Sequence, residues 1–162
     1  MDILEFALEK ERLSREYYHQ LSAKANNPGL QNILEMLADQ ESQHCHTIEN
    51  MRNHIPADLT ETDVLEEAKD IFNDIRESIE QFDFNISEVE LYRNARDKEQ
   101  KSMEFYLEKA HQVDDEYQRG IFLELADEEH KHLIVIDNIC EFVESPEYYL
   151  ENAEFVHMAE DF

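Results

Sequence analysis

Apolar residues recur every three or four positions along most of the chain, which is the spacing of one face of an α-helix. The pattern predicts four long helices, over residues 2–26, 29–53, 88–112 and 115–144. Typical helix-ending sequences, "NNPG", "IPADLT" and "SP", follow the first, second and fourth helices, and a capping box from Ser87 to Glu90 precedes the third. The chain is therefore predicted to be all-α.

Two further segments complete the predicted architecture. The stretch 54–86 is too long for a tight turn and carries apolar residues at helical spacing, so we expect it to include a helix lying along the bundle. Ser145 as N-cap and Pro146 at the first helical position predict a short helix over residues 146–162. Two helical hairpins joined by one long crossover form a known four-helix bundle. We therefore expect one domain over residues 1–145, followed by a helical tail.

Composition and charge narrow the possible partners. The 162 residues include 40 acidic and 14 basic side chains, for a formal net charge of -26. Such a chain repels phosphate backbones and anionic lipid, so neither nucleic acid nor a membrane is expected as a partner. The acidic start "MDILEFALEK" does not resemble a signal peptide, and no apolar run reaches about 18 residues. A cytoplasmic protein is expected.

The apolar stripe of each long helix is interrupted by a glutamate near the middle of the helix. These residues are Glu11, Glu41, Glu99 and Glu129. Three residues after the second and fourth glutamates, on the same helical face, stand His44 and His132. His46 and His130 fall off the stripe. The prediction is that four carboxylates and two imidazoles meet inside the bundle.

Burying four carboxylates without compensation would cost several kcal/mol per ion, so positive charge is expected among them. Two divalent cations would balance the four negative charges, and two neutral imidazoles would complete the coordination. A set of carboxylate and imidazole ligands without sulfur suits iron or manganese better than Cu(I) or a structural zinc. Only Cys45 and Cys140 are present, too few for a four-thiolate centre or a disulfide framework.

An internal repeat supports this hypothesis. The phrase "LADQESQH" over residues 37–44 returns as "LADEEHKH" over residues 125–132, shifted by 88 positions. With the same shift, "KERLSREYY" over residues 10–18 lies over "KEQKSMEFY" at residues 98–106. The halves are therefore predicted to be duplicated hairpins related by a pseudo-twofold axis, each supplying three ligands to one metal ion.

These motifs resemble the ferritin-like di-iron carboxylate superfamily, and within it the rubrerythrin branch. Each hairpin pairs a Glu-x-x-His with a Glu-x6-Tyr, and the resemblance spans about residues 2–144. It implies a ferritin-like bundle that holds two iron ions, with manganese as the other possible metal. The implied ligand roles are Glu11 and His44 on one ion, Glu99 and His132 on the other, and Glu41 and Glu129 as bridges. Tyr18 and Tyr106 would form hydrogen bonds to the ligand carboxylates.

The chain departs from the classical rubrerythrins in two ways. It contains no C-x-x-C pairs of a rubredoxin domain, so an external electron donor, such as a rubredoxin-like protein, is expected. Ser102 stands where the family carries an additional glutamate, which weakens the expectation of the family's ligand exchange during peroxide reduction. Glu154 and His157 form a third Glu-x-x-His in the tail; we expect capping or a dimer contact there, because the six-ligand set is already complete.

The resemblance implies an oxidoreductase that reduces hydrogen peroxide or dioxygen at a di-iron centre. The alternative is a ferroxidase that passes iron into a storage cage, and the two differ in assembly size. A third interpretation is a polar layer that only specifies helix pairing. A homodimer or larger homo-oligomer is expected, and the sequence leaves open whether hairpins are exchanged between chains.

Overall fold

The predicted all-α fold is confirmed. The computed structural model describes residues 2–78 and 82–152, and within these ranges it contains helices and no strands. The helices are α1 (Ile3–Lys24), α2 (Pro28–Arg52), α3 (Val64–Glu77), α4 (Ile86–Gln112), α5 (Glu116–Glu144) and α6 (Pro146–Asn152).

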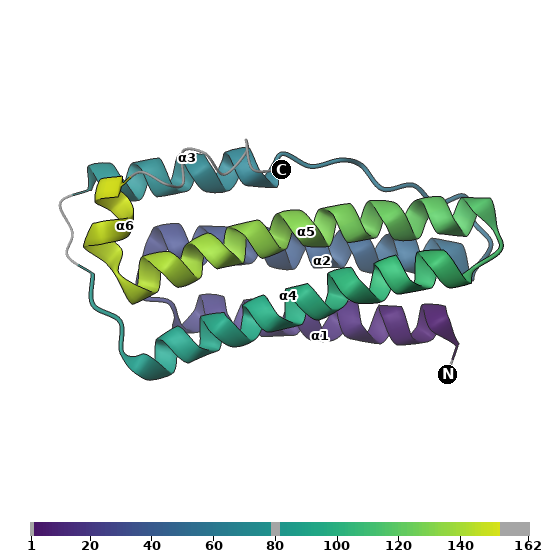
Figure 1. The fold of residues 1–162 in the computed structure, drawn as a ribbon, viewed down its shortest axis with the longest axis horizontal. Coiled ribbons are helices and arrows are strands. Elements are labelled where there is room, and N and C mark those ends of the chain that lie inside the picture. Colours follow the sequence, from purple (N-terminus) through teal and green to yellow (C-terminus); the bar gives the residue numbers. More distant parts are fainter. Residues whose placement is uncertain (1, 79–81, 153–162) are drawn as a thin grey trace.

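The four long helices lie side by side along the long axis of the molecule (Figure 1). α1 packs mainly against α2, and α4 packs mainly against α5, so the bundle consists of two hairpins. The crossover between them carries α3, which packs on α2 and α5, while α6 packs against the end of α5. This is the ferritin-like arrangement of two hairpins, one long crossover and a short C-terminal helix. The crossover therefore lies on the α2–α5 side of the bundle, away from the side that α1 and α4 form.

Polar side chains cap the long helices at their N-termini. The carboxylate of Asp2 accepts the backbone N–H of Glu5 at 2.8 Å, and Asn27 and Asp115 cap α2 and α5 in the same manner. The predicted capping box at Ser87 is wrong, because α4 begins at Ile86. Asn85 is its N-cap: the backbone there is extended, and its side-chain oxygen accepts the N–H of Glu88 at 2.9 Å.

Two apolar clusters lie at opposite ends of the bundle. One includes Phe72, Phe142 and Tyr149, whose rings meet edge to face or tilted at the α3 and α6 end. The other includes Ile48 and Phe122 near the opposite end. The stripes that the sequence predicted do face inward, and their ionisable residues lie between the two clusters. The interruption of the stripes is thus a single buried polar layer.

The tail begins as predicted, with Pro146 as the first residue of α6. Tyr149 anchors it, since the ring is buried and its hydroxyl donates to Asn138 Oδ1 at 2.7 Å. Residues 153–162, which include Glu154 and His157, lie outside the described residues. Among the described helices, none combines the length and the apolar character required to cross a membrane.

Candidate metal centre

Four helices bring the six predicted ligands into one buried layer. Each helix contributes a glutamate, α2 and α5 each add a histidine, and none of the six is more than 2% exposed. Two overlapping groups could each hold a cation, because each residue offers one ligand atom and these atoms lie within 4.8 Å of one another. The groups are Glu11, Glu41, His44 and Glu129, and Glu41, Glu99, Glu129 and His132. The two glutamates of the repeated phrase therefore belong to both groups.

The histidines connect the two hairpins. His44 Nδ1 lies 2.9 Å from Glu129 Oε1, and His132 Nδ1 lies 2.8 Å from Glu41 Oε1, so each imidazole faces the glutamate of the other hairpin. The two rings are nearly parallel, with an interplanar angle of 8° and centroids 5.5 Å apart. This near-symmetric pairing is what duplicated hairpins related by a pseudo-twofold axis would produce.

The two tyrosines also cross between the hairpins. Tyr106 Oη donates to Glu11 Oε1 at 2.6 Å, and Tyr18 Oη donates to Glu99 Oε1. Burial, together with the adjacent carboxylates, raises the pKa of both phenols well above their ordinary value. They therefore stay neutral and act as donors, and each one orients the carboxylate of the opposite half.

Buried polar atoms that lack a hydrogen bond, here called orphaned, indicate whether the layer is suited to cations. Among residues 2–78 and 82–152, the buried side-chain oxygen and nitrogen atoms without a hydrogen bond are confined to this layer. Leaving one buried polar group unsatisfied costs about 1–3 kcal/mol, so a cluster of them is unfavourable unless a ligand satisfies it. The atoms are Glu11 Oε2, Glu41 Oε2, His44 Nδ1, Glu99 Oε2, and both carboxylate oxygens of Glu129. Hard oxygen donors joined by imidazole nitrogen fit iron or manganese ions.

The four carboxylates fall into two groups, one with a raised pKa and one with a lowered pKa. Burial raises the pKa of Glu41 and Glu129 well above the ordinary value, and the charges of the neighbouring glutamates raise it further. Burial also disfavours ionisation of Glu11, but the charge of His44 and several hydrogen bonds outweigh it and lower its pKa to about 2. Burial opposes ionisation of Glu99 as well, yet hydrogen bonds and the charge of His132 lower its pKa. Without metal, the two shared glutamates therefore hold a proton more readily than Glu11 and Glu99, and a bound cation would displace such a proton.

Sequence reasoning missed the polar groups that lie behind the ligands. The ring nitrogen of His132 that faces away from Glu41, Nε2, lies 3.4 Å from the side-chain oxygen of Gln40. Glu128, at the equivalent position of the repeat, is only 3% exposed, which is unusual for a glutamate. The signal was present in the repeat, because Gln40 and Glu128 directly precede the two shared glutamates.

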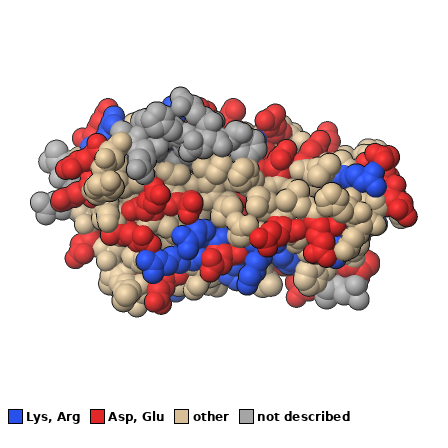
Figure 2. All heavy atoms as spheres, in the orientation of Figure 1, with Lys and Arg blue, Asp and Glu red and all other residues tan. Residues whose placement is uncertain are grey.

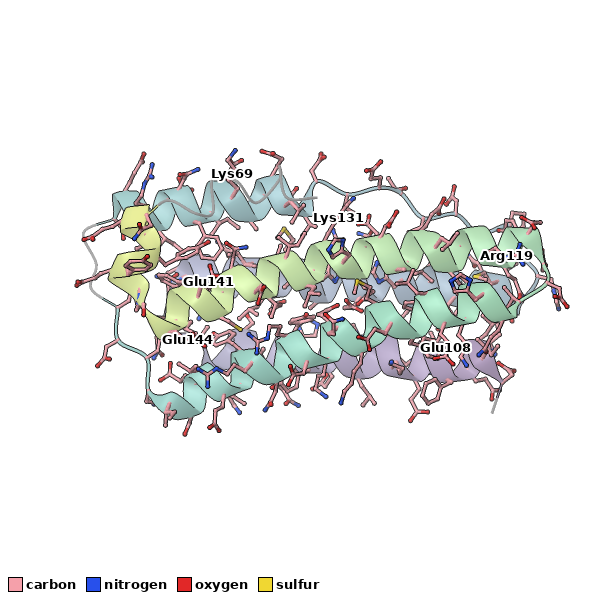
Figure 3. All side chains as sticks on the ribbon, in the orientation of Figure 1. Lys69, Glu108, Arg119, Lys131, Glu141 and Glu144 are labelled. Carbon is pink, nitrogen blue, oxygen red and sulfur yellow. The ribbon has the colours of Figure 1, made fainter. Side chains whose placement is uncertain are left out.

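Glu128 is held by the crossover rather than by a histidine. Its carboxylate accepts the backbone N–H of Thr62 at 2.9 Å and the hydroxyl of Thr62 at 3.2 Å. Lys131 Nζ lies 3.3 Å from Glu128 and 3.5 Å from Glu61. Figure 3 shows Lys131 on the side of α5 that faces the crossover. A buried ion pair thus connects the crossover to the helix that carries Glu129 and His132.

The remaining candidate residues do not join the layer. His46, which falls off the predicted stripe, is exposed, and so are His19, His54 and His111. Burial raises the pKa of the Cys45 thiol to about 11 and that of Cys140 to about 12, so both remain protonated.

Comparison with known proteins identifies the family of the chain. No curated protein and no solved structure matches this chain. The family model for rubrerythrin matches residues 2–139, which include the first hairpin, most of the second and every residue of the buried layer. The chain therefore belongs to the rubrerythrin family.

Proposed function

We propose that this protein is a non-haem di-iron oxidoreductase that reduces hydrogen peroxide or dioxygen with electrons from an external donor. One observation carries the proposal: the orphaned buried carboxylate atoms belong to two ligand groups that share Glu41 and Glu129. Two adjoining cation sites with common carboxylates are the arrangement needed to deliver two electrons at one place.

The residues divide into three sets by position. Glu11 and His44 would hold one ion, and Glu99 and His132 would hold the other. Glu41 and Glu129 would contact both ions, because each belongs to both groups. When bound, two ferrous ions would supply the two electrons that reduce one hydrogen peroxide, with two protons, to two molecules of water.

The protein's own groups prepare the site for this chemistry. The four carboxylates match the charge of two divalent ions, so the loaded layer is formally neutral within an apolar interior. Tyr18 and Tyr106 hold Glu99 and Glu11 in place through their hydroxyl groups. The apolar clusters on both sides, which include Ile48 and Phe72, keep bulk water from the layer.

Iron storage is the second candidate, and the charge of the chain favours it. With 40 acidic residues against 14 basic ones, the surface can gather cations and guide them toward the centre. In that case the same centre would act as a ferroxidase, passing oxidised iron into a closed shell of many chains.

The peroxidase proposal includes a homodimer or small homo-oligomer, a cytoplasmic location and a rubredoxin-like donor. Manganese remains the alternative metal.

Iron stoichiometry tests the proposal. The metal-free protein is loaded with ferrous iron, passed through a sizing column, and the iron per chain in the protein peak is counted. A plateau near two per chain on a small oligomer supports the di-iron enzyme, and the oxidation rates with peroxide and dioxygen then identify the oxidant. Tens or hundreds of iron atoms per chain in a large shell would instead establish storage. Absence of bound iron would make the layer a structural one.

A further inference from the structure

The negative charge of the chain is distributed very unevenly among its helices. α1 and α4 together carry nine basic and ten acidic residues, and two of those acids are the buried Glu11 and Glu99. The rest of the chain carries five basic and thirty acidic residues. Figure 2 shows lysine and arginine side chains gathered along α4 in the lower middle of the view, whereas acidic residues dominate elsewhere. Among the described helices, α1 and α4 therefore form the side that repels an anionic partner least.

Lysines on this side stack on aromatic rings in a pseudo-symmetric pattern. Lys10 Nζ of α1 lies 4.6 Å from the ring centroid of Phe105 on α4, and Lys98 Nζ of α4 lies 5.2 Å from that of Tyr17 on α1. The two pairs exchange under the shift of 88 positions that relates the hairpins. Within the described residues Lys10, Lys98 and Lys101 make no ion pair, so their charges remain available to a partner.

We define the basic face as Lys10 and Tyr17 of α1 with Lys98, Lys101, Phe105 and Lys109 of α4. Apolar area accompanies the charge, since Phe6, which is 46% exposed, meets Phe105 at a centroid distance of 5.3 Å. Aromatic residues are enriched at the centres of protein interfaces and polar residues form their rims, so the exposed rings supply a centre and the lysines a rim.

The basic face is also directly connected to the ligand layer. Phe105 contacts Tyr106 edge to face at 5.3 Å, and the Tyr106 hydroxyl donates to Glu11. On the other helix, Tyr17 is followed by Tyr18, whose hydroxyl donates to Glu99. Two short paths of bonded or touching groups therefore lead from the basic face to ligands of both cation groups, so a donor seated there would be separated from the centre by a single layer of side chains.

We propose that the basic face is the docking surface for an acidic, one-electron carrier protein. The proposal rests on the proposed function, which requires an external donor. Lysines of the face attract a carrier of negative charge, and the acidic remainder of the chain repels it, so approach through α1 and α4 is selected. Two reduced carriers, each losing one electron on docking, would return the two electrons that one hydrogen peroxide consumes.

A second copy of this chain fits the basic face less well. A symmetric contact would set lysines against lysines, and a contact with the acidic side of another chain would be heterologous and would not close by itself. A small carrier of opposite charge faces neither difficulty.

Binding of a carrier to charge-reversed variants tests the proposal. The full-length iron-loaded protein is titrated with a rubredoxin of net negative charge, by calorimetry or NMR, at roughly 10 mM ionic strength, where screening is weak over about 30 Å. We expect Lys98→Glu/Lys101→Glu to weaken binding at least about tenfold. Lys69→Glu is the control, because Lys69 lies on α3, across the molecule from α4 (Figure 3), and should change binding less than about twofold.

Each possible result bears on the proposal. Equal affinities for the double variant and Lys69→Glu, or no saturable binding to the wild-type protein, would overturn it. A wild-type dimer that the double variant dissociates would also overturn it, because a second copy would then cover the face. If the reversed variant fails to fold, the neutral variant Lys98→Gln/Lys101→Gln replaces it, with a smaller loss of affinity expected. Failure of the proposed function appears separately, as missing iron in the wild-type protein, because the titration does not depend on turnover.

Discussion

The hairpins α1–α2 and α4–α5 carry the same candidate ligands but differ in the residues behind them. Glutamate, Glu-x-x-His and tyrosine occur at equivalent positions in both halves. The positions directly before the shared glutamates hold neutral Gln40 in α2 and charged Glu128 in α5. Gln40 contacts the opposite histidine, whereas Glu128 is engaged by Thr62 and Lys131. The two hairpins thus place different groups behind the same set of candidate ligands.

The crossover accounts for this difference. In α5 the carboxylate and the ammonium group are both buried beneath the crossover, and a buried charge requires a partner and hydrogen bonds. The equivalent pair in α2 is Gln40 and the exposed Gln43, both neutral. The asymmetry teaches that the two halves share the residues of the inner layer, while the surroundings of each helix select the layer behind it.

The largest effect is expected where the halves are equivalent. Glu41→Ala and Glu129→Ala should each abolish binding of both ions, because each glutamate belongs to both groups. Metal per chain after loading and gel filtration measures this. The controls are Asp39→Ala and Asp127→Ala, exposed positions two residues earlier in each helix, which should retain the wild-type metal content. Two bound ions in the Glu41→Ala variant would contradict the assignment.

Glu128→Ala removes a buried ion pair that is present in α5 and has no counterpart in α2. It leaves Lys131 buried beside an exposed Glu61 and removes the acceptor of Thr62, so we expect a loss of about 3–5 kcal/mol in unfolding free energy. Urea denaturation of the metal-free protein measures the change, with the exposed neighbour replaced in Glu124→Ala as the control. Glu128→Gln, which places the α2 residue into α5, should lose less because an acceptor for Thr62 remains. A cost for Glu128→Ala no larger than that of the control would rule out a role for the ion pair in stability.

The tyrosines should behave alike in both halves. Tyr18→Phe and Tyr106→Phe each remove a donor to a buried ligand carboxylate, which should cost about 1.5–3 kcal/mol in stability of the metal-free protein. Thermal or urea unfolding checks the size and the equality of the two effects. Tyr148→Phe, at a ring that is 64% exposed, is the control. Markedly unequal costs would show that the pseudo-symmetry of the layer does not extend to its energetics.

Gln40→Ala should affect metal binding more than folding. The substitution removes the group that contacts His132 Nε2, and loss of such a partner typically lowers metal affinity about 10–100-fold. Competition with a chelator measures the affinity, and Gln43→Ala, one turn further along α2 and exposed, is the matched control. If both variants bind metal equally well, Gln40 does not position the histidine.

The effect of pH is the most gradual. The pKa values of Glu41 and Glu129 are higher in the folded chain than in the unfolded chain, so these residues stabilise the metal-free fold at pH values below the unfolded-state pKa. This stabilisation is lost as the pH rises through the folded-state pKa. Glu11, whose folded pKa is lowered to about 2, contributes in the opposite sense, and its stabilisation is lost as pH falls toward that value. The melting temperature of the metal-free protein should therefore fall toward neutral pH, while that of the loaded protein should not. Parallel curves for the two forms would show that cations do not replace the protons.

Much of the fold followed from local periodicity. The four helices, the inward stripes and the unusual glutamates all appear within single segments, so spacing alone predicts them. The predicted start of α4 was wrong, because Ser87 and Asn85 are both residue types that favour the N-cap position, and the choice between them depends on backbone conformation rather than on composition. The burial of Glu128 was not predicted, because the chain has 40 acidic residues and no local feature distinguishes a buried acid from a solvated one.

The sequence by itself determined which residues form the buried polar layer, because helical spacing and the repeat of 88 positions place them at one level of the bundle. Only the tertiary structure decided their partners. Tyr18 reaches Glu99, Glu128 meets Thr62, and Lys10 covers a ring of α4, each across at least 66 positions of chain. Such pairings depend on how the hairpins and the crossover dock together, and helical periodicity carries no information about which helix lies opposite another.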